Sequence, residues 1–89
     1  MIIDEKEIER RLKTSVEGKG GLCLKFVSPG WDGAPDRICL WPGGRVSFYE
    51  VKRPGKRARP LQLRRLEQLR RLGFKAEVID SKESAIGAS

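Results

Sequence analysis

The chain has 89 residues, and its 19 Lys and Arg against 12 Asp and Glu give a formal net charge of +7. This length suits one domain spanning residues 1–89, with a stability margin that dimerisation would widen. The charge favours a polyanionic partner, which could be nucleic acid, an acidic membrane or an acidic protein. With no histidine, the chain cannot build a Ser/His triad, a two-His zinc site or a His general base.

Membrane insertion and secretion are not expected. No apolar run approaches the roughly 20 residues that a membrane span requires, and the first residues, MIIDEKE, do not resemble a signal peptide. Cys23 and Cys39 lie in apolar runs without C-x-x-C spacing, so we expect buried, reduced cysteines in a cytoplasmic protein. A disulfide between neighbouring strands is the alternative.

The first predicted element is a helix over residues 4–16. Ile8, Leu12 and Val16 recur at helical spacing, and charged residues fill the other faces. Asp4 is the expected N-cap, and Glu7, three residues later, could complete a capping box. The glycines at 18, 20 and 21 end the helix.

Strands, a second helix and a final strand follow. The Pro42-Gly43-Gly44 turn joins two strands into a hairpin, and Pro60 fits the first turn of the second helix. Ser81 could cap a short final turn that frays at the tail. The order α-β-β-β-α-β predicts an α/β domain, a small mixed sheet flanked by helices. The expected strands are 22–27, 37–41, 45–52 and 74–79, and the second helix is 60–72, with Leu63, Leu66, Leu69 and Leu72 on one side.

The chemistry is expected where Asp36 meets Glu50 and Lys52. Side chains alternate along a strand, so Glu50 and Lys52 share the face of the apolar Val46 and Phe48. The hairpin also brings the start of its first strand, at Asp36, beside the end of its second, at Glu50. Alone, an E-x-K triplet commonly marks a solvated strand face, and a Pro-Asp pair commonly marks a turn.

Two close carboxylates repel each other, and a divalent cation removes the conflict. Mg²⁺ or Mn²⁺ would suit two carboxylates together with the backbone carbonyl of Val51 and a substrate phosphate. Such a cation polarises the phosphate and lowers the pKa of a bound water. Lys52 could orient that water or stabilise charge that develops on the phosphate.

These residues belong to a longer pattern. Gly33-Ala34-Pro35-Asp36-Arg37, then Glu50-Val51-Lys52, then Pro60-Leu61-Gln62 resembles the VRR-NUC branch of the PD-(D/E)xK nucleases, in its stand-alone phage and prophage form. The resemblance runs roughly from residue 5 to residue 80. It implies a PD-(D/E)xK core and a metal-dependent homodimeric endonuclease, often acting on branched DNA such as four-way junctions.

The resemblance also implies roles for single residues. Asp36 and Glu50 would bind the metal, Lys52 would be the catalytic lysine, and Gln62 matches the family's glutamine at the start of the second helix. The family has a first-helix glutamate facing the metal, and Glu5 fits because it lies on the predicted buried stripe. Glu9 is the alternative, whereas the side chain of Glu7 points away.

Basic residues around the predicted site could follow DNA phosphates. Trp31, in the loop before Asp36, is expected to pack on the core or across a dimer, although it could wedge against bases. The rival functions are a non-catalytic DNA-binding module of the same fold and a basic protein that binds an acidic protein partner. The expected DNA contacts are Arg53, Lys56, Arg57, Arg59, Arg64 and Arg65, whereas Arg70 and Arg71 could equally be a solvated helix face.

Overall fold

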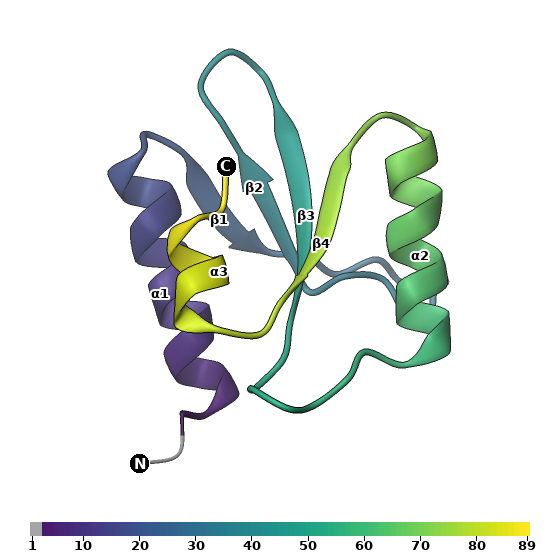
Figure 1. The fold of residues 1–89 in the computed structure, drawn as a ribbon. Helices are drawn as coiled ribbons and strands as arrows, with labels where there is room; N and C mark the ends of the chain where they lie inside the picture. Colours follow the sequence, from purple (N-terminus) through teal and green to yellow (C-terminus); the bar gives the residue numbers. More distant parts are fainter. Residues whose placement is uncertain (1–2) are drawn as a thin grey trace.

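The computed structural model describes residues 3–89 and consists of a four-stranded sheet between two helical layers (Figure 1). Helices α1 and α3 cover one face of the sheet, and α2 packs on the other face against β4. The observed order confirms the predicted α/β architecture, with one additional short helix at the end. The elements are α1 (Glu5–Gly18), β1 (Leu22–Lys25), β2 (Arg37–Leu40), β3 (Val46–Val51), α2 (Pro60–Arg71), β4 (Lys75–Ile79) and α3 (Lys82–Ile86).

The sheet is mixed, as expected, with the strand order β1-β2-β3-β4. The pairs β1–β2 and β2–β3 are antiparallel, and β4 returns parallel to β3 through α2. The β2–β3 hairpin closes through Gly43 and Gly44, whose φ angles of 86° and 83° are readily adopted only by glycine. The predicted Pro42-Gly43-Gly44 turn is therefore confirmed.

Strand β3 is buried on both faces, which explains its continuous run of buried residues. Phe48 packs with Leu66 and Leu69 of α2, whereas Tyr49 and Val51 lie in the cluster built on α1. Glu50 and Lys52 therefore lie on the same sheet face as Phe48, as the alternation predicted. The α1 cluster includes Ile8, Leu12 and Val16, which are fully buried.

The buried face of α2 differs from the prediction. Its buried residues are Gln62, Leu66 and Leu69, whereas Leu63 and Leu72 are 48% and 75% exposed. Leu72 follows Leu63 by nine positions, which is about two and a half helical turns, so the two side chains point to opposite sides of the helix axis. The prediction that all four leucines share one side is therefore wrong.

The first and last helices each depart from the prediction in one respect. The Asp4 side chain accepts a hydrogen bond from the Glu7 backbone N–H at 2.9 Å, which confirms the N-cap. The Glu7 carboxylate, however, pairs with two arginines of α1 instead of closing a capping box. At the other end, Ala85 of α3 and Ala88, which follows α3, are buried in the α1 cluster, so the prediction of a fraying tail is wrong.

Cys23 lies directly opposite Cys39 across β1 and β2, and both thiols are free and buried, as expected. Among residues 3–89, no helix combines the length and the apolarity that a membrane span needs.

Candidate active site

The two predicted acids lie side by side because of the hairpin register. Arg37 of β2 pairs with Tyr49 of β3, so Asp36 lies opposite Glu50 at the next position. Both carboxylate oxygens of Asp36 lie within 3.2 and 3.3 Å of the Val51 backbone nitrogen, which donates to them. The Asp36 carbonyl accepts from the Phe26 N–H at 2.8 Å, which ties its backbone to the end of β1.

Glu50 is the most deeply buried acid of the site, with only 4% of its surface exposed. Its Oε2 accepts a hydrogen bond from Nε2 of Gln62 at 2.9 Å and lies 3.4 Å from Nζ of Lys52. Its Oε1 is buried with no hydrogen-bond partner within residues 3–89. A buried carboxylate oxygen without a partner is costly unless a ligand completes it.

Both acids hold their protons more tightly than free carboxylic acids do. Burial is the main cause that raises the pKa of Asp36 to about 7, and the nearby Glu50 charge adds to it, whereas the Val51 N–H opposes it. Burial also raises the pKa of Glu50, against the opposing charge and hydrogen bond of Lys52. Ionising both acids together is therefore unfavourable unless further positive charge joins Lys52.

The chemistry of these donors fits a hard divalent cation. Asp36 and Glu50 offer carboxylate oxygens, and Oε1 of Glu50 is free to bind. The N–H and the C=O of one strand residue point to the same side of the strand. Because the Val51 N–H points to Asp36, its carbonyl is directed to that side as well. Oxygen donors of this kind are those that Mg²⁺ and Mn²⁺ prefer.

The first-helix acids do not join this pair directly. Glu5 is exposed, so the expectation that it lies on the buried stripe is wrong, because burial on α1 begins at Ile8. Its charge nevertheless raises the pKa of both Asp36 and Glu50. Residues 3–89 contain no group of three acidic, cysteine or histidine side chains close enough to share a metal. Direct binding of a metal ion by Glu5 stays a prediction.

Glu9, the alternative acid, forms an ion pair with Arg37. Its Oε1 pairs with the guanidinium of Arg37, whose Nε lies 3.0 Å away. This ion pair links α1 to the start of β2, next to Asp36. Because the two residues are 28 positions apart, no local sequence pattern could have revealed it.

Gln62 lies where the motif predicted, inside the site. Its Oε1 accepts from the Arg59 N–H at 2.8 Å while its Nε2 donates to Glu50. The first bond fixes the amide orientation, so that the NH₂ group faces the carboxylate. Gln62 is 7% exposed, so its hydrogen bond from α2 to Glu50 is buried.

Known proteins match this chain in both sequence and fold. A family model described as VRR-NUC domain matches residues 5–83. The chain belongs to the VRR-NUC family. "Putative nuclease p44" of Acyrthosiphon pisum secondary endosymbiont phage 1 is 43% identical over 82 residues, covering 92% of this chain and 88% of that protein. A solved structure described as a VRR_NUC domain has a TM-score of 0.81 at 30% identity, covering 91% and 88% of the two chains.

The family assignment makes this chain a nuclease with a PD-(D/E)xK-like fold. The predicted family resemblance is thereby confirmed. The roles of single residues in this VRR-NUC chain rest on the geometry given above and stay predictions.

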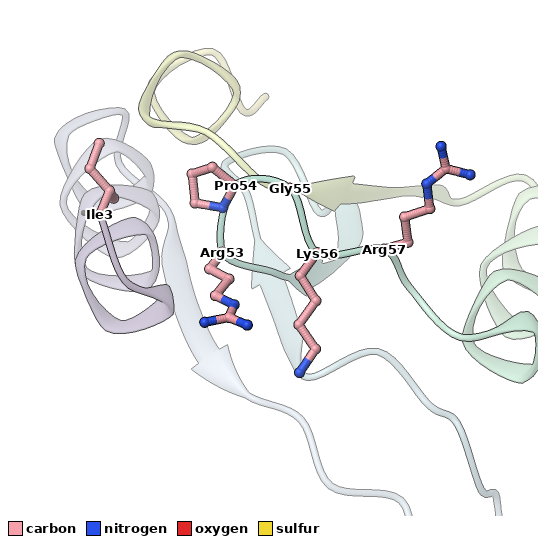
Figure 2. A pocket seen from close by; sticks show the side chains of 6 residues that line it. All are labelled: Ile3, Arg53, Pro54, Gly55, Lys56 and Arg57. Atoms are coloured by element: carbon pink, nitrogen blue, oxygen red, sulfur yellow. The ribbon is translucent and has the colours of Figure 1, made fainter. Parts of the chain in front are cut away.

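The basic loop after β3 begins directly after Lys52 and therefore borders the candidate site. Residues 53–57 line a hollow together with Ile3, near the start of α1. Figure 2 shows that the side chains of Arg53 and Lys56 extend to one side of this loop, whereas Arg57 extends to the other. The exposed members of the predicted DNA-contact set are Arg53, Lys56, Arg57, Arg59 and Arg64.

Arg65 differs from the other predicted DNA contacts because it is partly buried and engaged within the protein. Its Nε donates to the Asp32 carbonyl at 2.7 Å, and its Nη1 donates to Gln68 at 3.0 Å. Its guanidinium carbon lies 5.0 Å from the ring centroid of Trp31. Trp31 itself packs against the α2-side core, in agreement with the expected packing role.

Proposed function

We propose that this VRR-NUC nuclease is a Mg²⁺- or Mn²⁺-dependent endonuclease that hydrolyses phosphodiester bonds in DNA. The single observation that carries the proposal is Oε1 of Glu50, which is buried beside the Asp36 carboxylate and has no hydrogen-bond partner in the described part of the chain. Without a cation, this arrangement combines a desolvated carboxylate oxygen with like-charge repulsion. A divalent cation removes both penalties at once.

The residues that would hold the cation are Asp36, Glu50 and the Val51 carbonyl, with Glu5 as the further proposed acid. When bound, the cation supplies Lewis-acid polarisation of a phosphate and a water of lowered pKa. Lys52 supplies a positive charge at the same place, since its Nζ lies 3.4 Å from Oε2 of Glu50 and its side chain is only 11% exposed. In this poorly solvated position, the ammonium stabilises negative charge on the phosphate more strongly than it would in water.

Gln62 binds the same carboxylate from α2. It donates to Oε2 of Glu50, which leaves Oε1 as the free oxygen. Partners that orient a metal-binding carboxylate commonly influence metal affinity by about 10–100-fold. We therefore assign Gln62 to positioning Glu50.

The DNA would approach along the basic loop that follows Lys52. Arg53 and Lys56 are exposed on the same side of this loop, and Arg59 lowers the pKa of Glu50, so its charge reaches the site. These side chains, with Arg57 and Arg64, would contact phosphates, and binding should weaken steeply with added salt. Recognition of DNA shape, and not of base sequence, is the proposed mode of binding.

Branched DNA, such as a four-way junction, is the proposed substrate, and a homodimer is the proposed active form. Outside the area covered by α2, the β1–β2 face carries the apolar side chains of Leu22, Leu24 and Leu40, which are 54%, 44% and 38% exposed. A contiguous apolar surface of this kind suits contact with a second copy. A two-fold dimer also matches the symmetry of a junction. The setting we propose is the cytoplasm of a bacterial host, for a phage- or prophage-encoded protein.

A cleavage panel tests the proposal. Single-stranded, duplex, flap and four-way-junction DNA are each incubated with the protein in Mg²⁺, Mn²⁺ or EDTA. We expect cleavage only with a divalent ion, and fastest cleavage of the junction. Glu50→Gln should abolish cleavage but preserve binding, whereas Glu67→Gln, on the exposed side of α2, should cleave normally.

Several outcomes would contradict the proposal. DNA binding without cleavage in any metal would indicate a non-catalytic DNA-binding module. Neither binding nor cleavage would favour an acidic protein as the partner. Equal cleavage by the Glu50→Gln variant would refute the assignment of the site.

A further inference from the structure

The long connection between β1 and β2 leaves the sheet and reaches α2 before it returns to Asp36 (Figure 1). It contains Trp31, which packs against the α2-side core cluster of Phe48, Leu66, Leu69 and Ala76. Residues 28–35 contain Pro and Gly residues and form turns instead of regular structure. The position of Asp36 therefore depends partly on where this loop is fastened.

Arg65 of α2 is the principal polar attachment of this loop. Its Nε donates to the Asp32 carbonyl at 2.7 Å, and its guanidinium lies over the Trp31 ring at 5.0 Å. Its Nη1 also donates to Gln68, one turn along the helix, at 3.0 Å. Two nitrogen donors of the guanidinium and one face of its plane therefore already have partners within the protein.

A second contact holds the same loop against the first turn of α2. A Cβ added at Gly33 would lie 2.7 Å from Cγ of Leu61, and the φ of +80° at this position is one that other residues rarely adopt. The loop backbone therefore lies directly against the helix, three residues before Asp36. Pro35, between the two, is fully buried.

The same stretch of α2 also holds the second acid. Gln62, which follows Leu61, donates to Glu50, whereas Arg65, one turn later, holds the loop that leads to Asp36. The helix thus reaches both carboxylates, one through a direct hydrogen bond and the other through the loop. The strand register and the Phe26 N–H hold Asp36 from the β1 and β3 sides, and the loop attached to α2 holds it from the third side.

We propose that Arg65 is a positioning residue of the nuclease site, which fastens the 28–35 loop to α2 and thereby sets Asp36 opposite Glu50. This assignment rests on the proposed function and replaces the sequence-based expectation that Arg65 contacts DNA phosphates. Arg64, its exposed neighbour, faces solvent and remains available for phosphate. Adjacent arginines of one helix therefore have different tasks.

The test compares Arg65→Ala with Arg64→Ala in full-length protein. Three quantities are measured: the single-turnover cleavage rate, the salt dependence of DNA binding in EDTA, and the Mn²⁺ affinity of the DNA-free protein by calorimetry. For Arg65→Ala we expect at least a tenfold slower rate and several-fold weaker Mn²⁺ binding, with an unchanged salt slope. For Arg64→Ala we expect a shallower salt slope and unchanged Mn²⁺ affinity.

A second variant and a rescue separate positioning from general destabilisation. Arg65→Lys retains a positive charge but lacks the planar fork, so it should show the same Mn²⁺ defect while remaining folded by circular dichroism. Adding millimolar ethylguanidinium to Arg65→Ala should restore part of the rate, which a loss of folded protein would not allow.

The inference is overturned if Arg65→Ala binds Mn²⁺ as the wild type does, or if its only defect is a shallower salt slope. Both results would make Arg65 a phosphate contact or a bystander. Failure of the proposed function would look different, because the wild type itself would then neither cleave DNA nor bind Mn²⁺.

Discussion

Replacing Asp36 with Asn should stabilise the metal-free protein at alkaline pH, although it destroys the metal site. The pKa of Asp36 is raised from 3.8 to about 7, mainly by burial and then by Glu50. Each pKa unit corresponds to about 1.4 kcal/mol, so ionising Asp36 in the folded state costs up to about 4 kcal/mol. Partial solvent access lowers this figure, and we expect about 2–4 kcal/mol. The introduced amide retains an oxygen that can accept from the Val51 N–H.

The sign follows from proton linkage. Between about pH 4 and pH 7, the folded protein holds a proton on Asp36 that the unfolded chain has released. The free energy of unfolding of the metal-free wild type should therefore fall as the pH rises through this window. The Asp36→Asn variant has no proton to lose at this position, so it should lack this part of the decline. Near pH 4 the two proteins should be about equally stable.

Urea unfolding in EDTA at pH 4.5, 6 and 8 measures this difference. Asp80→Asn, at an exposed position after β4, is the control and should match the wild type. At pH 8, Mn²⁺ should reverse the order of stability and make the wild type more stable than Asp36→Asn, because the ion stabilises only the protein that binds it. An Asp36→Asn variant that is less stable than the wild type in EDTA at pH 8 would refute the reasoning.

Other perturbations test separate parts of the site. Gln62→Ala should lower the cleavage rate about 10–100-fold and weaken Mn²⁺ binding in calorimetry, because Glu50 loses its orienting donor; an unchanged rate would remove Gln62 from the site. Arg53→Gln with Lys56→Gln should reduce the salt slope of DNA binding by about 2 in a log–log plot; the wild-type slope would exclude these residues as phosphate contacts. Leu24→Glu on the exposed β1–β2 face should convert a dimer into a monomer in sedimentation; a persistent dimer would place the interface elsewhere.

The sequence sufficed for features that depend on local periodicity and short spacing. The hairpin turn at 42–44 and the alternation along β3 predicted that Asp36 and Glu50 would be neighbours, with Lys52 on the same face. The motif at residues 60–62 also predicted that Gln62 would face the site. Each of these conclusions needed only the geometry of one hairpin or one helix turn.

What the sequence did not reveal depends on contacts between distant elements. The pairing of Glu9 with Arg37 and the attachment of the loop by Arg65 join residues 28 and 33 positions apart. The exposure of Glu5 was missed because helical spacing predicts which face of a helix is buried, but not how far along the helix the sheet covers that face. The tail was misjudged for a similar reason, since Ala85 and Ala88 become core residues only when α3 docks on α1.

Anomalous diffraction from a crystal soaked in Mn²⁺ tests the central claim most directly. The account predicts a manganese peak in contact with Asp36 and Oε1 of Glu50, and no such peak in crystals of the Glu50→Gln variant. A soaked wild-type crystal in which both carboxylates are ordered but no manganese lies between them would contradict the account.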